Sequence, residues 1–399
     1  MTYQGKGLAL AGLALLGTLP VGVAQAFQVR SGDWTTSLDT TLSYGVSYRM
    51  EDQDNKLIAR ANGGKGSNAG LINSDDGNLN FRKGELFSEV VKAVSELDLR
   101  YQDQYGIFVR GRTFYDFELE DDERRHRQIS NDGLDEAGSS ADLLDAFVYG
   151  SWTVNERALN ARLGRQVINW GEGLYYQNGI GATNPVDINA LRAPGSEVKE
   201  AYMPTFMVSG SFELRDNLTV EGYWQPGWAW EASKIGPCGT YYSALDVLGE
   251  GCDYLSASPL QEAATGLVGE PMAFDNPAAA QAYADSLAPG FVNDLLRGYL
   301  PSTFIQRGKD IDADDSPQYG AALRWYVPEL NDTELGFYYL RYNMQVPMIG
   351  LTVGQPVTLP GAGTLPDASS SRYYAEYLEK RDLFGISFNT SIGGDSIFN

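Results

Sequence analysis

Segments that alternate apolar and polar residues are joined in this chain by connections that are, in turn, short and long. A period of two predicts extended strands that have one apolar and one polar face. The long connections are mostly polar, and the short ones are residues 102–106, 154–157, 215–217 and 328–333. Short turns at one end and long loops at the other are typical of transmembrane β-barrels of bacterial outer membranes.

About ten strands are predicted, each close to the about 9–11 residues that a tilted membrane strand needs. They cover residues 38–49, 88–101, 107–117, 143–153, 158–168, 205–214, 218–228, 318–327, 334–344 and 382–391. If the first strand rises from the periplasm, every short turn lies on the periplasmic side. We therefore expect an all-β fold, an antiparallel transmembrane β-barrel with long extracellular loops.

One face of these strands carries charged side chains, which a barrel would turn toward water. The expected lumen-lining residues are Asp39, Lys92, Glu96, Asp98, Arg100, Arg110, Arg112, Asp116 and Arg162. In 143–153, Leu144 is expected on the apolar face and Asp145 opposite it. A secreted β-sandwich would also show alternating strands. It would have no need of so many charges facing a common interior, and this favours the barrel.

Residues 1–26 read as a secretory signal peptide, with Lys6 before an apolar stretch and small residues before Phe27. The alternative is a membrane anchor, but the apolar stretch, residues 7–19, is shorter than the about 20 residues that span a bilayer. An exported chain is periplasmic, secreted or a barrel. Aromatic residues make up 12% of the chain, which favours the barrel, so we expect it in the bacterial outer membrane with lipid as a partner. Its net charge of −22 argues against nucleic acid as a partner.

The longest loop, residues 229–316, holds Cys238 and Cys252, which we expect to form a disulfide in an oxidising compartment. It also holds a stretch compatible with a helix, 277–287, where Pro277 follows Asn276 as at a helix start. Two interpretations stay open for this loop. It folds over or into the mouth of the barrel as a gate, or it forms a solvated surface lobe.

Motifs for chemistry are weak. The one histidine, His126, lies among charged residues in a loop, which argues against a catalytic triad. Asp310, Asp312 and Asp314 begin like a calcium loop, but the later positions of that motif are absent. We therefore expect no catalytic residues, no metal site and no cofactor.

Several short motifs in residues 164–204 stand in one order: GRQ at 164–166, NWGE at 169–172, NPVD at 184–187, APG at 193–195 and KE at 199–200. This arrangement resembles the proteobacterial outer-membrane proteins of domain-of-unknown-function family 1302. Residues 75–81, 237–241 and 385–390 fit the same family, so the resemblance covers essentially the whole mature chain. Family members are generally longer, and barrel chains commonly end in an aromatic residue, whereas Asn399 follows Phe398 here. We therefore expect the N-terminal part of a larger barrel.

The resemblance implies a porin-like barrel that handles hydrophobic or amphipathic compounds, alongside an inner-membrane export system of the resistance-nodulation-division type. Within 164–204, a polar network with an aromatic wall is expected at the mouth from Arg165, Trp170, Glu172 and Asp187. It would be a constriction or ligand site, or a loop that only packs the mouth. The expected function is passage or binding of small, partly hydrophobic solutes. The alternatives are a non-conducting scaffold of an envelope export complex and, disfavoured by the single histidine, an outer-membrane enzyme.

Overall fold

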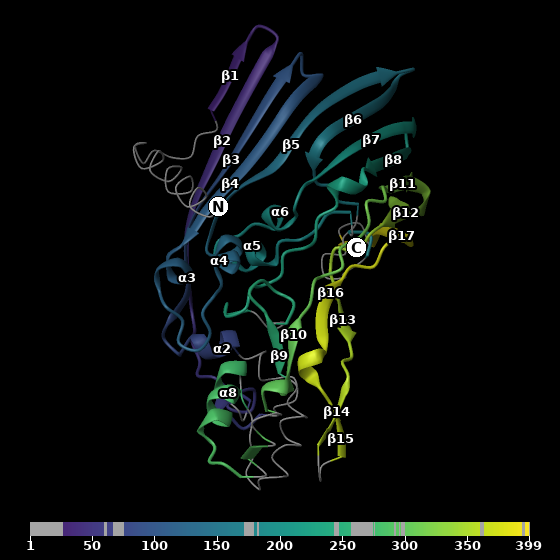
Figure 1. Cartoon of the computed structure of the whole chain (residues 1–399). Helices are drawn as coiled ribbons and strands as arrows, with labels where there is room; N and C mark the ends of the chain where they lie inside the picture. Colours follow the sequence, from purple (N-terminus) through teal and green to yellow (C-terminus); the bar gives the residue numbers. More distant parts are fainter. Residues whose placement is uncertain are drawn as a thin grey trace.

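A computed structural model describes residues 27–59, 62–66, 76–170, 179–181, 183–242, 247–256, 274, 276–290, 293–294, 296, 300–359, 363–392 and 396–398. The expected signal peptide, residues 1–26, and Glu172 lie outside the described residues. The described part is mostly β-strand, with few and short helices (Figure 1). None of the described helices is long and apolar enough to cross a membrane.

The main element is a twelve-stranded antiparallel sheet in which each strand pairs with the one that follows it along the chain among these twelve. Its strands are β1 (Phe27–Ser31), β2 (Trp34–Tyr48), β3 (Leu86–Tyr101), β4 (Tyr105–Asp116), β5 (Ser139–Val154), β6 (Arg157–Gln166), β7 (Thr205–Arg215), β8 (Leu218–Gln225), β11 (Gln318–Val327), β12 (Thr333–Tyr342), β17 (Arg381–Ile392) and β18 (Ser396–Phe398). All ten predicted strands are present, and β1 and β18 are additional. The sheet is open, with β1 and β18 at its edges, so a closed barrel is not seen.

Tight turns join the strands at one end of the sheet. Asn155 and Glu156 between β5 and β6 both have positive φ, at 51° and 66°. Two such residues form the turn whose twist matches that of a hairpin. Asn331 and Asp332 before β12 adopt the same left-handed conformation, which Asn and Asp tolerate better than most residues. The long connections lie at the other end (Figure 1).

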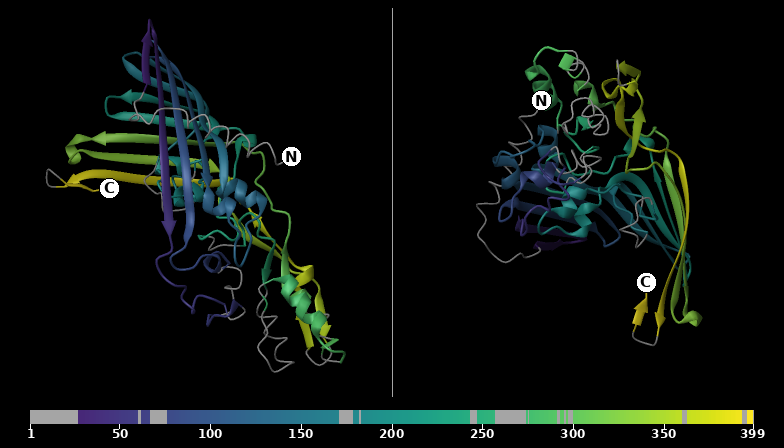
Figure 2. Two further views of the ribbon diagram at one scale, coloured as in Figure 1. Left: turned by 90° about the vertical axis from the view of Figure 1, so that its left-hand side faces the viewer. Right: turned by 90° about the horizontal axis from the view of Figure 1, so that it is seen from below.

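The two faces of the sheet differ as the alternation predicts. The sheet curves around the segment that carries the short helices α5 and α6, and this defines its concave face (Figure 2). On the opposite, convex face, large apolar side chains are exposed: Leu42, Tyr44, Val46, Ile107, Leu143, Val148, Leu163, Val208, Trp224, Trp325, Phe337, Phe384 and Ile386. An exposed apolar surface of this extent marks a site of contact with a membrane or a protein.

The placement of Leu144 on the convex face was wrong. The pairing of β4 with β5 shifts between Val109 and Gly111, so two residues of β5 oppose one of β4. Such a bulge interrupts the alternation, so that two neighbouring side chains of the strand can lie on the same face. Leu143 is 56% exposed, whereas Leu144 is 6% exposed and lies beside Asp145 on the concave side.

A second, four-stranded sheet lies among the long loops and was not predicted. It is ordered β13 (Met348–Thr352), β16 (Arg372–Glu376), β10 (Phe304–Arg307) and β9 (Tyr254–Ser256), and β14 (Pro356–Leu359) pairs with β15 (Gly363–Pro366) beside it. The 3₁₀ turns are η2 (Gly227–Ala229), η3 (Leu300–Thr303), η4 (Pro328–Leu330) and η5 (Ala368–Ser370).

The helices are α2 (Asp76–Asn80), α3 (Phe117–Asp121), α4 (Asn131–Ala137), α5 (Ile188–Arg192), α6 (Val198–Ala201) and α8 (Pro277–Ser286). In α8 the Asn276 side chain accepts a hydrogen bond from the Ala279 amide at 2.8 Å, as the sequence predicts for a helix start. Cys238 and Cys252 form the expected disulfide, with a Cα–Cα distance of 5.5 Å. Residues 229–316 thus contain a disulfide and a helix, and also strands β9 and β10.

Candidate functional site

The connection between β6 and β7 folds back onto the concave face of the main sheet. We call residues 183–204, which carry α5 and α6, the inner segment. Its two ends are tied together by Asn184, whose amide nitrogen donates to the carbonyl oxygens of Gln166 and Met203, both at 3.1 Å. The Asn184 side-chain oxygen also accepts from the Ile168 amide at 2.9 Å. One buried amide therefore closes this long connection into a compact unit.

A buried ion pair fixes the middle of the inner segment to β3. Lys92 Nζ lies 2.7 Å from Glu200 Oε2, and each side chain is only 4% exposed. The same Lys92 ammonium donates to the Gly195 carbonyl oxygen at 3.1 Å. Glu200 Oε1 also accepts from the Glu197 amide at 3.2 Å and so completes the start of α6. A pair this deeply buried is costly to break from one side, because the remaining charge stays desolvated.

Arg112 on β4 makes the second connection. Its Nη2 lies 3.0 Å from the Asp187 carboxylate of the inner segment and 2.9 Å from the Asp142 carboxylate of β5. Asp187 also accepts from the Ala190 amide at 2.9 Å, which makes it the cap of α5. Asp187 therefore has two structural roles: it caps α5 and it pairs with Arg112 on β4.

Arg110 on β4 makes the third connection. It pairs with Asp145 of β5, and its Nη2 donates to the Lys199 carbonyl oxygen at 3.4 Å. The Lys199 ammonium reaches back to Glu96 on β3 at 3.2 Å. Four of the charges predicted to line the interior, Lys92, Glu96, Arg110 and Arg112, thus bind the inner segment.

A glycine in β2 allows the inner segment to approach the sheet. A Cβ atom placed on Gly45 would lie 2.7 Å from Pro194 Cβ and 3.1 Å from its carbonyl carbon. Real Cβ atoms essentially never come so close. Gly45 therefore provides the space in which the turn before α6 rests.

Toward the tight turns, the concave face holds a hollow that we call the turn-side cavity, with a volume of about 590 Å³. Asp98 and Arg162 line it, and the Arg162 guanidinium lies over the Phe147 ring at 5.4 Å. Asp98 accepts from the Tyr149 hydroxyl at 2.8 Å and pairs with Arg100 at 2.8 Å. The lining is therefore charged and aromatic at once.

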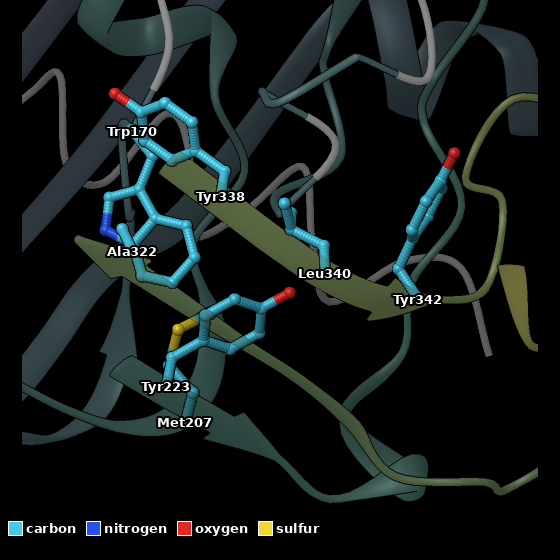
Figure 3. Packing of buried hydrophobic residues seen from close by; sticks show 7 residues of the cluster. All are labelled: Trp170, Met207, Tyr223, Ala322, Tyr338, Leu340 and Tyr342. Carbon is cyan, nitrogen blue, oxygen red and sulfur yellow. The ribbon is translucent and has the colours of Figure 1, made fainter. Parts of the chain in front are cut away.

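Trp170 forms one wall of the turn-side cavity, and its indole nitrogen donates to Glu221 at 2.8 Å. Glu221 also pairs with Arg324 at 2.9 Å. Figure 3 shows Trp170 gathered with Tyr223 and Tyr338, and the ring centroids of Trp170 and Tyr223 lie 5.3 Å apart. The buried cluster consists of Trp170, Met207, Tyr223, Ala322, Tyr338, Leu340 and Tyr342.

Toward the long loops lies a smaller space, the loop-side pocket, with a volume of about 70 Å³. It is bounded by β3, β4, α5 and residues 240–242. Among the side chains that line it are Phe87, Arg112, Phe114, Asn189, Arg192 and Tyr241. The inner segment thus borders the loop-side pocket through residues 189–200, whereas the turn-side cavity is lined by the strands and by residues 167–170.

The remaining predicted residues have other surroundings. Asp116 caps α3 and accepts from Ser88 Oγ at 2.5 Å, so its main contacts are structural. Asp39 is exposed and pairs in register with Glu96. Arg165 pairs with Glu231 at 2.9 Å. Arg165, Trp170 and Asp187 thus have their polar partners in three different places, instead of in one network at the mouth.

Sequence reasoning missed the acidic partners Asp142, Asp145, Glu200 and Glu221. The alternation places Asp145 of β5 and Glu221 of β8 on a polar face, which is a usable signal. Asp142 lies three positions from Asp145, and only the bulge in β5 brings both carboxylates to the same face. Glu200 follows Lys199 in a loop, and no local pattern shows that it reaches Lys92, which is 108 positions away.

Glu136 in α4 is a half-buried carboxyl outside the strands. Burial raises its pKa to about 7, the nearby Glu250 and Asp187 add to this effect, and Lys234 opposes it. Among the described residues, Glu136 is therefore a carboxyl group whose charge changes near neutral pH.

Among the described residues, no group of three or more His, Cys, Asp or Glu is placed to hold a metal ion. His126 Nε2 lies 3.1 Å from an Asp76 carboxylate oxygen, and Arg127 binds the other oxygen of the same group. These contacts join α2 to the loop that precedes α4.

No curated protein matches the sequence. The model of the family described as "Protein of unknown function (DUF1302)" matches residues 7–399. This match spans nearly the whole chain, in agreement with the resemblance carried by the motifs of residues 164–204. The chain belongs to the DUF1302 family.

Proposed function

We propose that the main sheet is the wall of an outer-membrane β-barrel and that the protein is a porin-like channel for small, partly hydrophobic solutes. The observation that carries the proposal is the opposition of the two faces. Apolar side chains are exposed on the convex face, and charged side chains surround a folded-in loop on the concave face. In a transmembrane barrel the first face meets lipid and the second meets water.

Strand length supports the membrane part of the proposal. β3 and β5 each contain 16 residues and β4 contains 12. Since about 9–11 residues are enough to cross a bilayer, these strands are long enough to span it.

Lipid offers no hydrogen bonds to an open sheet edge. The proposal therefore includes pairing of both edges of the sheet in the membrane.

The inner segment supports the channel part. A loop held against the inside of a barrel narrows the path, and the charges that hold it set the field along that path. Transport would be passive, because the mechanism requires only pore size and polarity. The aromatic and charged lining of the turn-side cavity suits solutes that are partly apolar.

A non-conducting scaffold for an envelope export complex is the second candidate. It is favoured by the same buried ion pairs, because a segment held at Lys92, Arg110 and Arg112 resists displacement. Co-purification with a periplasmic or inner-membrane partner, without solute flux, would favour this candidate over the channel.

The test is reconstitution of the purified protein in planar bilayers and liposomes. We expect discrete steps of ion current, and uptake of small amphipathic solutes that empty liposomes do not show. Folded, inserted protein that gives neither current nor flux would contradict the channel. Solute uptake by a strain that lacks the gene provides the matching measurement in cells.

A further inference from the structure

The loop-side pocket is a preformed aromatic box. The Phe87 and Tyr241 rings stack with centroids 3.9 Å apart and planes 10° apart, and Tyr242 stands edge-on to Phe87 at 5.5 Å. Phe114 and Leu119 add apolar surface from β4 and α3. An apolar body placed here would exchange water for rings and aliphatic carbons.

Contacts outside the pocket hold its aromatic residues in place. Tyr241 follows the disulfide at Cys238, and the Arg49 guanidinium lies over its ring at 5.5 Å. The Asn80 amide nitrogen donates to the Gly239 carbonyl oxygen at 2.8 Å. Because these contacts exist without a ligand, binding would need little ordering of the loop.

One cation of the pocket differs from the others. Lys92 is paired with Glu200, and Arg112 with Asp142 and Asp187. Among the described residues Arg192 has no carboxylate partner: its Nη1 donates to the Tyr242 carbonyl oxygen at 2.9 Å, and its guanidinium lies 5.2 Å from the Tyr242 ring centroid. Partial burial lowers the pKa of Arg192. An anion beside it would offset that loss of hydration.

Two donors that line the pocket lack acceptors. Asn189 Nδ2 is buried without a hydrogen-bond partner, and so is Nε of Arg112, whose side chain is 4% exposed. A buried donor without an acceptor is destabilising, because it has lost its hydrogen bonds to water and gained none in the protein. Arg192, Asn189 and Arg112 all present N–H groups, so the missing group is an acceptor.

We propose that the loop-side pocket binds a small monocarboxylate with an aromatic or short aliphatic body. The carboxylate lies at Arg192 and Asn189, and the apolar body lies against Phe114 and Tyr241. About 10–15 Å³ of such space holds one water, so a volume of about 70 Å³ suits a body the size of one ring. The proposal depends on the proposed function in one respect: it assumes that the pocket lies on the path of the transported solute.

The test is calorimetry of the detergent-purified, disulfide-bonded protein with benzoate and with benzamide, its neutral counterpart. We expect benzoate to bind and benzamide to bind about tenfold more weakly, since the latter lacks the charge-assisted hydrogen bonds. The variant Arg192→Met should weaken benzoate about tenfold and leave benzamide unchanged. Arg192→Lys should retain part of the affinity.

Two further variants separate the site from general effects. Asn189→Asp, which keeps the side-chain shape, should abolish benzoate binding by placing a negative charge beside the ligand. Arg157→Met removes a cation at the distant tight turn and should change nothing. Absence of benzoate binding to folded protein, or equal binding to wild type and Arg192→Met, would overturn the proposal. Calorimetry in detergent does not depend on conductance in a bilayer, so the two proposals can fail separately. Benzoate binding without conductance would overturn only the channel. Conductance without benzoate binding would overturn only the pocket.

Discussion

At the scale of residues, the charges that hold the inner segment on the concave face are paired with charges of the opposite sign. The alternation of polar and apolar residues predicted that Lys92, Arg110 and Arg112 share a face, because facing is a local property of a strand. Their partners in the inner segment were not predictable, since Arg112 and Asp187 are 75 positions apart. A local pattern carries no information on which loop folds back to meet a strand.

Removing one side of the Lys92–Glu200 pair should destabilise the protein strongly. Lys92→Met leaves the Glu200 carboxylate buried without a cation, which costs about 3–5 kcal/mol. The double variant Lys92→Met with Glu200→Gln removes both charges and should recover most of that loss. Urea unfolding in detergent at pH 7 measures both, and equal stability of the single variant and wild type would refute the burial argument.

Glu136 should make stability depend on pH. Its pKa is raised to about 7 in the folded protein and is about 4.3 when unfolded, so folding favours its protonated form. The stability it contributes is complete below the unfolded pKa and is lost as the pH rises through about 7. Glu136→Gln should therefore match wild type at pH 4 and unfold at a higher temperature at pH 8. A difference in melting temperature that is the same at both pH values would be inconsistent with this origin.

At the scale of elements, strands of ten or more residues were predictable because each repeats its period several times, and the tight turns carry Asn and Asp. The bulge in β5 was not predictable, since no particular residue type in the strand marks the position where one extra residue is inserted. The second sheet was not predicted for a different reason. β9, β10, β13 and β16 have three to five residues, too few to show a period, and β10 pairs in parallel with a distant β16.

The seat of the inner segment on β2 should depend on Gly45. A side chain in Gly45→Val would meet Pro194 and push the segment off the sheet, so amide hydrogens of residues 188–201 should exchange faster. Gly111→Ala is the matched control, because its Cβ would meet only the Asp142 carbonyl oxygen at 3.6 Å, an ordinary contact. Unchanged protection of residues 188–201 in Gly45→Val would show that this contact does not hold the segment.

At the scale of the whole molecule, one curved sheet has two faces of different chemistry. Its convex face exposes apolar side chains, its concave face carries the inner segment and two hollows, and the long loops build a second sheet at one end (Figures 1 and 2). The order of short and long connections predicts at which end of the sheet the long loops lie, and the loop-side pocket lies toward that end. In a membrane, that side would meet the solute first.

The most direct test compares two neighbouring residues of β6 in the membrane-inserted protein. Leu163 is 45% exposed on the convex face, and Arg162 lines the turn-side cavity. Spin labels on Leu163→Cys and Arg162→Cys, with the native disulfide intact, report collisions with oxygen, which concentrates in lipid, and with a water-soluble nickel complex. We predict that the label at 163 collides mainly with oxygen and the label at 162 mainly with nickel. Nickel collisions at both positions would contradict the account, because the convex face would then meet water.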